Sequence, residues 1–134
     1  MATAKIQYQG NLRTEATHLK STNRIITDAP TDNNGKGEAF SPTDLVATAL
    51  PSCMITIMGI KARDKGIDIT GVTSEMTKIM VSNPRRISEV IVDLHMPSID
   101  ISDSDKKLLE TVAKACPVAK SIHPDIKQTV TFHW

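Results

Sequence analysis

The stretch FSPTDLVATALPSCM, from Phe40 to Met54, predicts the start of a long helix. Ser41 suits the N-cap, a proline follows at the first helical position, and Asp44 stands three residues after the serine, as in a capping box. Gly66 favours the left-handed C-cap conformation, and the basic residues before it suit the C-terminal end of the helix dipole. We therefore expect one helix from Ser41 to about Lys65.

No single apolar stripe follows this helix. Apolar or small residues occur on every side between Leu45 and Ile60, so we expect the helix to be covered all round, which in a domain of this size requires a partner subunit. Pro51 and Ser52 interrupt the uncharged run, which is shorter than a usual membrane span. We interpret the run as a buried helix that Pro51 kinks just before Cys53.

The residues before the helix predict three short strands. Apolar alternation with period two indicates one strand over residues 4–8 and a second over residues 12–16, joined by a turn at QGN. A third strand fits Arg24–Asp28. The segment Ala29–Ala39 is rich in Pro, Asn, Asp and Gly, which is typical of a loop.

The residues after the helix predict a hairpin, a broken helix and a last strand. Two strands fit Val72–Met80 and Ile87–Met96, joined by SNPRR. A capped helix begins at Ser102 and should end near Cys116, because the residue before a proline is disfavoured in a helix. A short helix, PVAKSI, follows, and a strand fits Lys127–Trp134.

This order of elements is typical of the α+β class. At 134 residues the chain has the length of one domain, so we predict a single domain over residues 1–134. The 16 basic and 15 acidic residues nearly balance, and one Trp, one Tyr and two Phe offer few stacking platforms, so we expect no nucleic-acid partner. The N-terminus has no apolar signal segment, and we expect a cytoplasmic protein with no membrane partner.

The two cysteines are the candidates for chemistry. Cys116 precedes Pro117 and so falls at a helix N-cap, where unpaired N–H groups and the helix dipole should lower its thiol pKa. Cys53 lies well inside the long helix and would need a charged neighbour for activation. Either cysteine is also compatible with an inert, buried apolar role. There is no C-x-x-C, and the four histidines show no ligand spacing, so we expect no metal.

The two cysteine motifs together, FSPTDLVATALPSCMITIM and CPVAKSI, resemble the OsmC/Ohr superfamily of thiol-dependent hydroperoxide reductases. The likeness extends to GKGEAFSPTDL and NPRRI and covers nearly the whole chain. It implies an intertwined homodimer in which sheets from both chains wrap two central helices. It also implies that Cys53 attacks an organic hydroperoxide, that Cys116 resolves the sulfenic acid as a disulfide, and that a dithiol such as a lipoyl group is the reductant. No cofactor is implied.

The resemblance further implies an arginine that activates the attacking thiol and an acidic residue that holds the arginine. By position the arginine is Arg13, with Arg24 as the alternative. The glutamate that follows the proline in the hydroperoxide reductases is Thr43 here. Asp44, one residue later, matches a less characterised branch of the superfamily, although the capping box also accounts for it. Glu38, on the loop before the helix, is a further candidate for the acidic residue.

We assign substrate binding to Glu38, Phe40 and Pro51, where the chain flanks the first cysteine. The leading hypothesis is a cysteine-based peroxidase. The second is a non-enzymatic redox-sensing or small-ligand-binding dimer, which the threonine at position 43 favours. The third is a structural dimer in which both thiols are inert.

Overall fold

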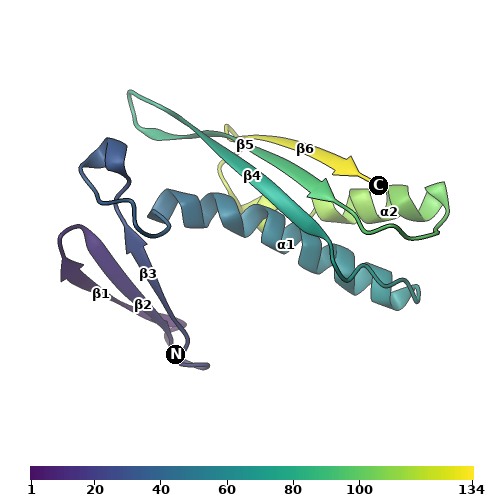
Figure 1. Ribbon diagram of the computed structural model, residues 1–134, viewed down its shortest axis with the longest axis horizontal. Coiled ribbons are helices and arrows are strands. Elements are labelled where there is room, and N and C mark those ends of the chain that lie inside the picture. The colour runs from purple at the N-terminus through teal and green to yellow at the C-terminus, as the bar shows by residue number, and fades with distance from the viewer. The chain divides into compact units, whose positions relative to one another are not determined.

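The computed structural model describes residues 1–134, which form two compact units, Met1–Val46 and Ala47–Trp134. The elements follow one another along the chain in the predicted order, as Figure 1 shows: three strands, a long helix, a hairpin, a broken helix and a last strand. This confirms the α+β fold class. The assignment of the whole chain to a single domain stays a prediction.

In the first unit three strands form an antiparallel sheet. They are β1 (Ala4–Gly10), β2 (Arg13–His18) and β3 (Arg24–Asp28), in the order β1-β2-β3. The expectation that Leu12 lies in the second strand is wrong. Leu12 has a φ of 62° and ends a run of three residues with positive φ, which is incompatible with extended backbone, so β2 begins one residue later.

The predicted loop 29–39 contains one turn of 3-10 helix, η1 (Thr31–Asn33), and folds back on its own start. The backbone N–H of Gly35 donates to the carbonyl of Pro30 at 2.9 Å. A Cβ at Gly35 would lie 1.7 Å from the carbonyl oxygen of Ala29, so only glycine fits this close approach.

The long helix α1 spans Pro42–Asp64, and a capping box fixes its start. The Ser41 hydroxyl accepts the backbone N–H of Asp44 at 3.0 Å, and the Asp44 carboxylate accepts the backbone N–H of Ser41 at 3.0 Å. The helix runs on through Pro51 and ends before Gly66, whose φ is 69°. Both predicted ends are therefore confirmed to within a residue.

Within the single chain only one stripe of α1 is buried, so the expected covering of its other sides by a partner subunit stays a prediction. The members of the stripe recur every three or four residues: Ala47, Leu50, Pro51, Met54, Met58 and Ala62. Val46 and Ile60, on other sides of the helix, are 45% and 46% exposed. The sequence pattern does not reveal this buried stripe, because the sides of α1 that the chain leaves exposed are apolar as well.

By length and composition alone α1 is apolar enough to cross a membrane, a test that the core helix of a soluble protein also passes. Three of its large side chains, Leu50, Met54 and Met58, have no exposed surface within the chain. This burial favours the interpretation of α1 as a core helix.

The second unit contains a mixed three-stranded sheet. β4 (Thr73–Val81) and β5 (Arg86–His95) form the predicted antiparallel hairpin, and β6 (Lys127–His133) pairs with β5 in parallel. The order is β4-β5-β6, so β5 is the central strand. Its inward residues are consequently the most buried of the sheet.

Two helices follow the hairpin, and they are separated at Pro117, as predicted. α2 spans Asp103–Lys114, and the Ser102 hydroxyl caps it by accepting the backbone N–H of Asp105 at 3.0 Å. α3 spans Pro117–Ser121, with Cys116 as its N-cap residue. The capping serine and the helix break are both confirmed.

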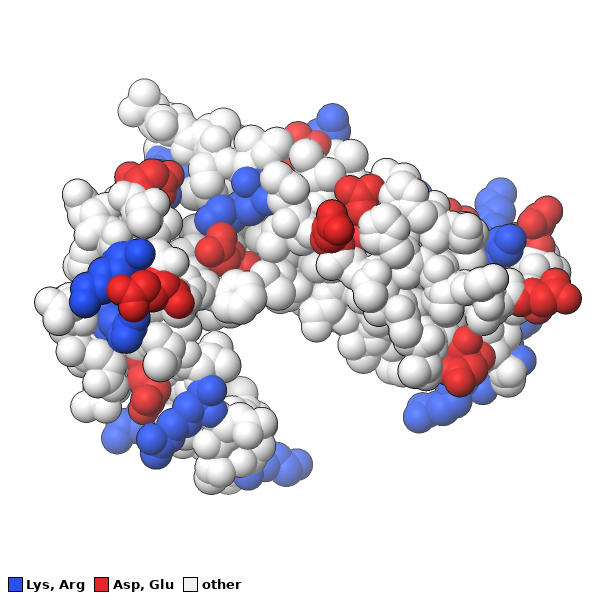
Figure 2. Space-filling view, viewed as in Figure 1, with Lys and Arg blue, Asp and Glu red and all other residues white.

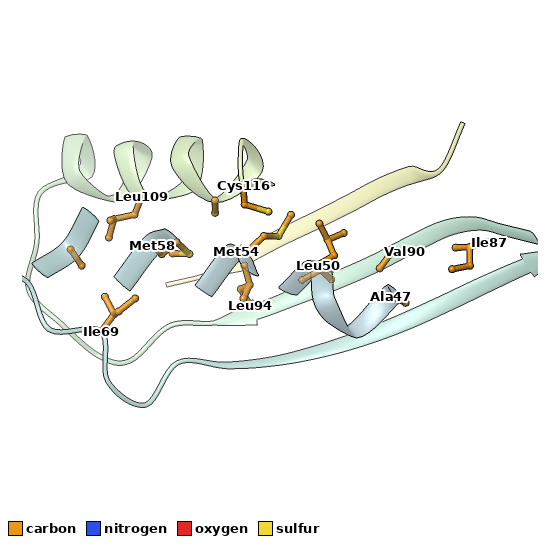
Figure 3. Packing of buried hydrophobic residues seen from close by; sticks show 13 residues of the cluster. Ala47, Leu50, Met54, Met58, Ile69, Ile87, Val90, Leu94, Leu109 and Cys116 are labelled. Atoms are coloured by element: carbon orange, nitrogen blue, oxygen red, sulfur yellow. The ribbon is translucent and has the colours of Figure 1, made fainter. Parts of the chain in front are cut away.

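The core of the second unit lies around α1 (Figure 3). Leu109 of α2 and Leu94 of β5 point toward Met54 and Met58 from different sides, and all four have no exposed surface. Cys116 belongs to the same apolar cluster. The cysteine of the second motif therefore lies against the helix that carries the first.

Charged side chains of both signs are interspersed on the face of the molecule that Figure 2 shows. With 16 basic and 15 acidic residues in the chain, neither sign dominates. This face offers a polyanion no extended basic surface.

Candidate functional site

Cys116 occupies the N-cap of α3, as predicted. Its backbone is extended, with φ −64° and ψ 155°, and its sulfur accepts the backbone N–H of Ala119 at 3.4 Å. The residue has no exposed surface. A thiol at this place is held by the helix start and kept away from water.

The prediction that the helix start lowers the pKa of Cys116 is wrong, because the pKa is raised above its ordinary value. Burial has the largest effect, since it penalises the thiolate, and the hydrogen bond from Ala119 opposes it only in part. The neighbouring Cys53 side chain raises the pKa of Cys116 further. α3 has only five residues, so its dipole is short.

Cys53 lies on α1 and is only partly buried, packed against the core cluster that contains Cys116. Its side chain is close enough to that of Cys116 to raise the pKa of the Cys116 thiol. Both cysteines are free thiols in the structure. The fold thus brings together two thiols that are far apart in sequence, one accessible and one enclosed.

The surroundings of the thiol pair are apolar. Met54 and Cys116 lie in the same part of the core, between α1 and the helices that follow the hairpin (Figure 3). A weakly polar environment disfavours a thiolate at the enclosed position. Of the two sulfurs, that of Cys53 is the more accessible to a substrate.

In the first unit Arg13 forms a two-bond ion pair with Asp28. The Arg13 Nε and Nη2 atoms donate to Asp28 Oδ1 and Oδ2 at 2.7 and 2.8 Å. The two residues are direct partners across β2 and β3. The side chain of Asp28 is only 2% exposed and that of Arg13 is 35% exposed.

The ion pair shifts the pKa of both groups. The hydrogen bonds from Arg13 are the main cause that lowers the pKa of the Asp28 carboxyl, against a smaller opposing effect of burial. The Arg13 pKa is raised in turn by the hydrogen bond and the charge of Asp28. Both groups therefore stay charged across the physiological range.

Sequence reasoning missed Asp28. It stands at the end of a predicted strand, immediately before a loop, where an aspartate is commonplace. The register that places it opposite Arg13 depends on how β2 and β3 pair, which the residues alone do not specify.

The other assigned residues lie in varied surroundings. Glu38 is exposed, with Oε2 at 3.6 Å from Arg13 Nη2, and its backbone N–H donates to Asp28 at 3.1 Å. Phe40 is 54% exposed, and Pro51 is buried in the stripe of α1. Their assignment to substrate binding stays a prediction, as does any catalytic role of Asp44 beyond the helix cap.

Arg24, the alternative arginine, pairs with Glu15 across β2 and β3 at 3.7 Å. Its side chain is 67% exposed, so water screens this pair far more than the pair of Arg13. Arg13 is the better held of the two arginines.

A groove of about 360 Å³ lies beside Arg13 in the first unit. Polar side chains, among them Gln9, Asn11 and Lys36, line it together with Arg13. The exposed part of the guanidinium is therefore open to small polar molecules. In the second unit a groove of about 570 Å³ runs between α1 and the loop 66–72.

Comparison with known proteins gives one family. The family model described as OsmC-like protein matches residues 35–131. A solved structure from Psychrobacter arcticus 273-4, whose name refers to osmotic stress induction and a detoxification response, is 59% identical, with a TM-score of 0.95 over 99% of this chain and 96% of that one. No protein of curated function matches the chain.

More distant structures share the fold. An organic hydroperoxide resistance protein OsmC from Legionella pneumophila is 18% identical, with a TM-score of 0.73 over 98% of this chain and 95% of that one. An OsmC-like protein from Vibrio cholerae O1 is 12% identical, with a TM-score of 0.79 over 98% of this chain and 100% of that one. The family match, the 59% identity and the shared fold agree with the resemblance seen in the cysteine motifs. The chain belongs to the OsmC-like protein family.

Proposed function

We propose that the chain is a thiol-dependent peroxidase that reduces organic hydroperoxides through Cys53 and Cys116. One observation carries the proposal: a partly exposed thiol packs against the same apolar cluster that holds a second thiol with no exposed surface, and it raises the pKa of that second thiol. The first is accessible to a substrate, and the second is placed to react with it afterwards. The names of relatives as organic hydroperoxide resistance proteins support the class of substrate.

In the first step the Cys53 thiolate attacks the outer oxygen of the hydroperoxide. The O–O bond breaks, the sulfur takes up the OH as a sulfenic acid, and the alkoxide leaves as an alcohol after it gains a proton. Sulfur is oxidised by two electrons and the peroxide is reduced by two. The resemblance gives the role of activating this thiol to Arg13, and the proposal keeps that role, because a guanidinium beside a thiol would favour its charged form.

In the second step the Cys116 thiolate attacks the sulfur of the Cys53 sulfenic acid. An S–S bond forms, the S–O bond breaks, and hydroxide leaves as water with the proton of the Cys116 thiol. A small dithiol, such as a lipoyl group, then reduces the disulfide by exchange and is itself oxidised to a cyclic disulfide. The proposal places this cycle in the cytoplasm, where thiols are kept reduced.

The proposal includes an intertwined homodimer. Large apolar side chains are exposed on both units of the single chain, which is more than a soluble monomer usually leaves uncovered. They include Ile6, Tyr8, Ile25, Ile26, Phe40, Val46 and Ile60. A second copy of the chain would cover them.

A redox sensor is the second candidate, and two observations favour it. The raised pKa of Cys116 leaves little thiolate at neutral pH, which slows the resolving step. Position 43 is also a threonine instead of the glutamate of the hydroperoxide reductases. A sensor would be oxidised once and would not turn over.

Mass spectrometry after one equivalent of cumene hydroperoxide tests the chemistry. We expect the wild type to lose two hydrogens and to yield a peptide that joins Cys53 to Cys116. The Cys116→Ser variant should stop at a sulfenic acid on Cys53, or at a more oxidised form. The Cys53→Ser variant should keep a reduced Cys116.

Two results would contradict the proposal. Reaction of neither cysteine would favour inert structural thiols. Oxidation of Cys116 in the Cys53→Ser variant, at the rate of the wild type, would reverse the two roles.

A further inference from the structure

We propose that Gln128 of β6 is a positioning residue for Cys116, on which it acts through the backbone of Ala119. The inference rests on the proposed function, in which Cys116 resolves the sulfenic acid of Cys53. Gln128 has no direct part in the chemistry. It holds the first turn of α3, and that turn carries an N–H group that binds the Cys116 sulfur.

Two hydrogen bonds meet at Ala119 and link Gln128 to Cys116. The Gln128 Nε2 atom donates to the Ala119 carbonyl at 3.0 Å. The Ala119 N–H donates to the Cys116 sulfur at 3.4 Å. The carbonyl therefore anchors to β6 the same residue whose N–H binds the thiol.

The helix α3 is too short to keep this geometry by itself. It has five residues, and isolated helices shorter than about 12 residues are marginal in water. The chain leaves the helical conformation at Ile122, where ψ is 157°. The last carbonyls of a helix lack partners within it, and Gln128 supplies a partner for that of Ala119.

Gln128 is an exception to the apolar pattern of its face of β6. Residues two apart in a strand share a face, and on this face Val130 and Phe132 pack against the core. The register partner of Gln128 on β5 is Val90, which is 1% exposed. A polar side chain at such a place costs free energy unless it is hydrogen-bonded, so the bond to Ala119 accounts for the glutamine.

The bond from Ala119 acts on the charge of the thiol. It lowers the pKa of Cys116, as does the N–H of Val118, whereas burial has a larger effect in the opposite direction and Cys53 also raises the pKa. The thiolate is the form that attacks the sulfenic acid. Loss of the Ala119 bond would therefore make Cys116 a slower resolving thiol.

Charged side chains around Cys116 cannot take over this role. The helix α1 has no charged residue from Leu45 to Ile60. Those on α2, on α3, on β6 and on the loop between α3 and β6 that are closest to Cys116 in sequence are exposed, so water screens them: Lys114, Lys120, His123, Asp125 and Lys127.

A merely structural role for Gln128 makes a different prediction. If its bond served only to join β6 to α3, its loss would lower the free energy of unfolding and leave the titration of Cys116 unchanged. If Gln128 positions Cys116, its loss lets the first turn of α3 move away from the sulfur. The thiolate then loses a donor, and the pKa of Cys116 rises.

The test follows the titration of Cys116 by carbon NMR in the full chain with Cys53→Ser, where cysteine labelled at Cβ gives a single signal. Gln128→Met keeps a side chain of similar length without a donor. We expect it to raise the pH midpoint by about half a unit, which leaves about threefold less thiolate at neutral pH. In the chain that retains Cys53, the same variant should slow the decay of the sulfenic acid about threefold.

The matched control is Thr129→Val. Thr129 lies beside Gln128 in β6, on the opposite face, and its hydroxyl bonds Glu89 of β5. The variant removes a side-chain bond from the same strand and should leave the midpoint of Cys116 unchanged. An equal shift in Thr129→Val, or no shift in a folded Gln128→Met protein, would overturn the inference. If Gln128→Met does not fold, an unshifted midpoint in Gln128→Asn, whose amide is one methylene shorter, would overturn it.

The failure of the inference differs from the failure of the proposed function. The titration contains no hydroperoxide, so it tests the role of Gln128 alone. Hydroperoxide turnover by the wild type with a dithiol tests the proposed function alone. Normal turnover with an unshifted Gln128→Met midpoint removes only the role of Gln128. A shifted midpoint without turnover keeps Gln128 as the residue that positions Cys116 and removes the peroxidase.

Discussion

Cys53, partly exposed on α1, packs against the apolar cluster that holds Cys116, which is fully buried at the start of α3. In the proposed cycle this arrangement separates two tasks. An attacking thiol must meet a substrate, whereas a resolving thiol needs to meet only the first sulfur. Burial raises the pKa of Cys116, which protects it from direct oxidation because the thiolate is the reactive form.

Disulfide formation should accelerate with pH. The raised pKa of Cys116 keeps its thiol mostly protonated at pH 7, so the thiolate fraction should increase about tenfold per pH unit until the pKa is reached. The measurement is the decay of the Cys53 sulfenic acid, trapped with dimedone after a pulse of hydroperoxide. A decay rate of the sulfenic acid that stays constant between pH 6 and 9 would contradict this prediction.

Much of the fold can be predicted from short stretches of the sequence. The capping box at Ser41 predicts where α1 begins, and the proline after Cys116 predicts where α2 and α3 separate. Both predictions depend only on residues within four positions of each other, the range over which capping and backbone preferences act. The hairpin of β4 and β5 is local in the same sense.

The features that could not be predicted from the sequence all depend on contacts between residues far apart in the chain. The partnership of Arg13 with Asp28 requires the register of β2 and β3. The pKa of Cys116 depends on enclosure by the core, which outweighs the local effect of the helix start. The buried stripe of α1 depends on which of several apolar sides meets the sheet and α2.

Truncation of the core should destabilise the second unit strongly. Leu50 has no exposed surface, so Leu50→Ala removes buried methyl groups and leaves a cavity, at a cost of about 2–5 kcal/mol in the free energy of unfolding. Ser52 is exposed on another side of the same helix, and Ser52→Ala should change the free energy of unfolding by less than about 0.5 kcal/mol. Urea titration measures the free energy of unfolding of the two variants. Equal losses of stability would contradict the burial of Leu50 in the core.

Loss of the α1 cap should have a smaller effect. Ser41→Ala removes the acceptor for the backbone N–H of Asp44, which should cost about 0.5–2 kcal/mol of stability. Ser41→Asp keeps an acceptor at the same place and should recover most of the loss. Chemical denaturation of both variants measures the difference, and no loss for Ser41→Ala would show that the cap is unimportant.

The proposed homodimer predicts a mass of two 14.6 kDa chains in sedimentation equilibrium. Ile60 is 46% exposed in the single chain, so Ile60→Asp should place a charge in the interface and shift the protein to monomer. Thr77→Asp, on an exposed position of β4, serves as the control and should stay dimeric. A monomeric wild type would exclude the dimer.

The most direct test of the peroxidase proposal is multiple turnover. Cumene hydroperoxide and dihydrolipoamide in large excess are mixed with the wild type, and the hydroperoxide consumed per chain is counted over time. The account predicts many equivalents for the wild type, none above background for Cys53→Ser, and strongly reduced turnover for Cys116→Ser. Consumption that stops at one equivalent, or never begins, would contradict it.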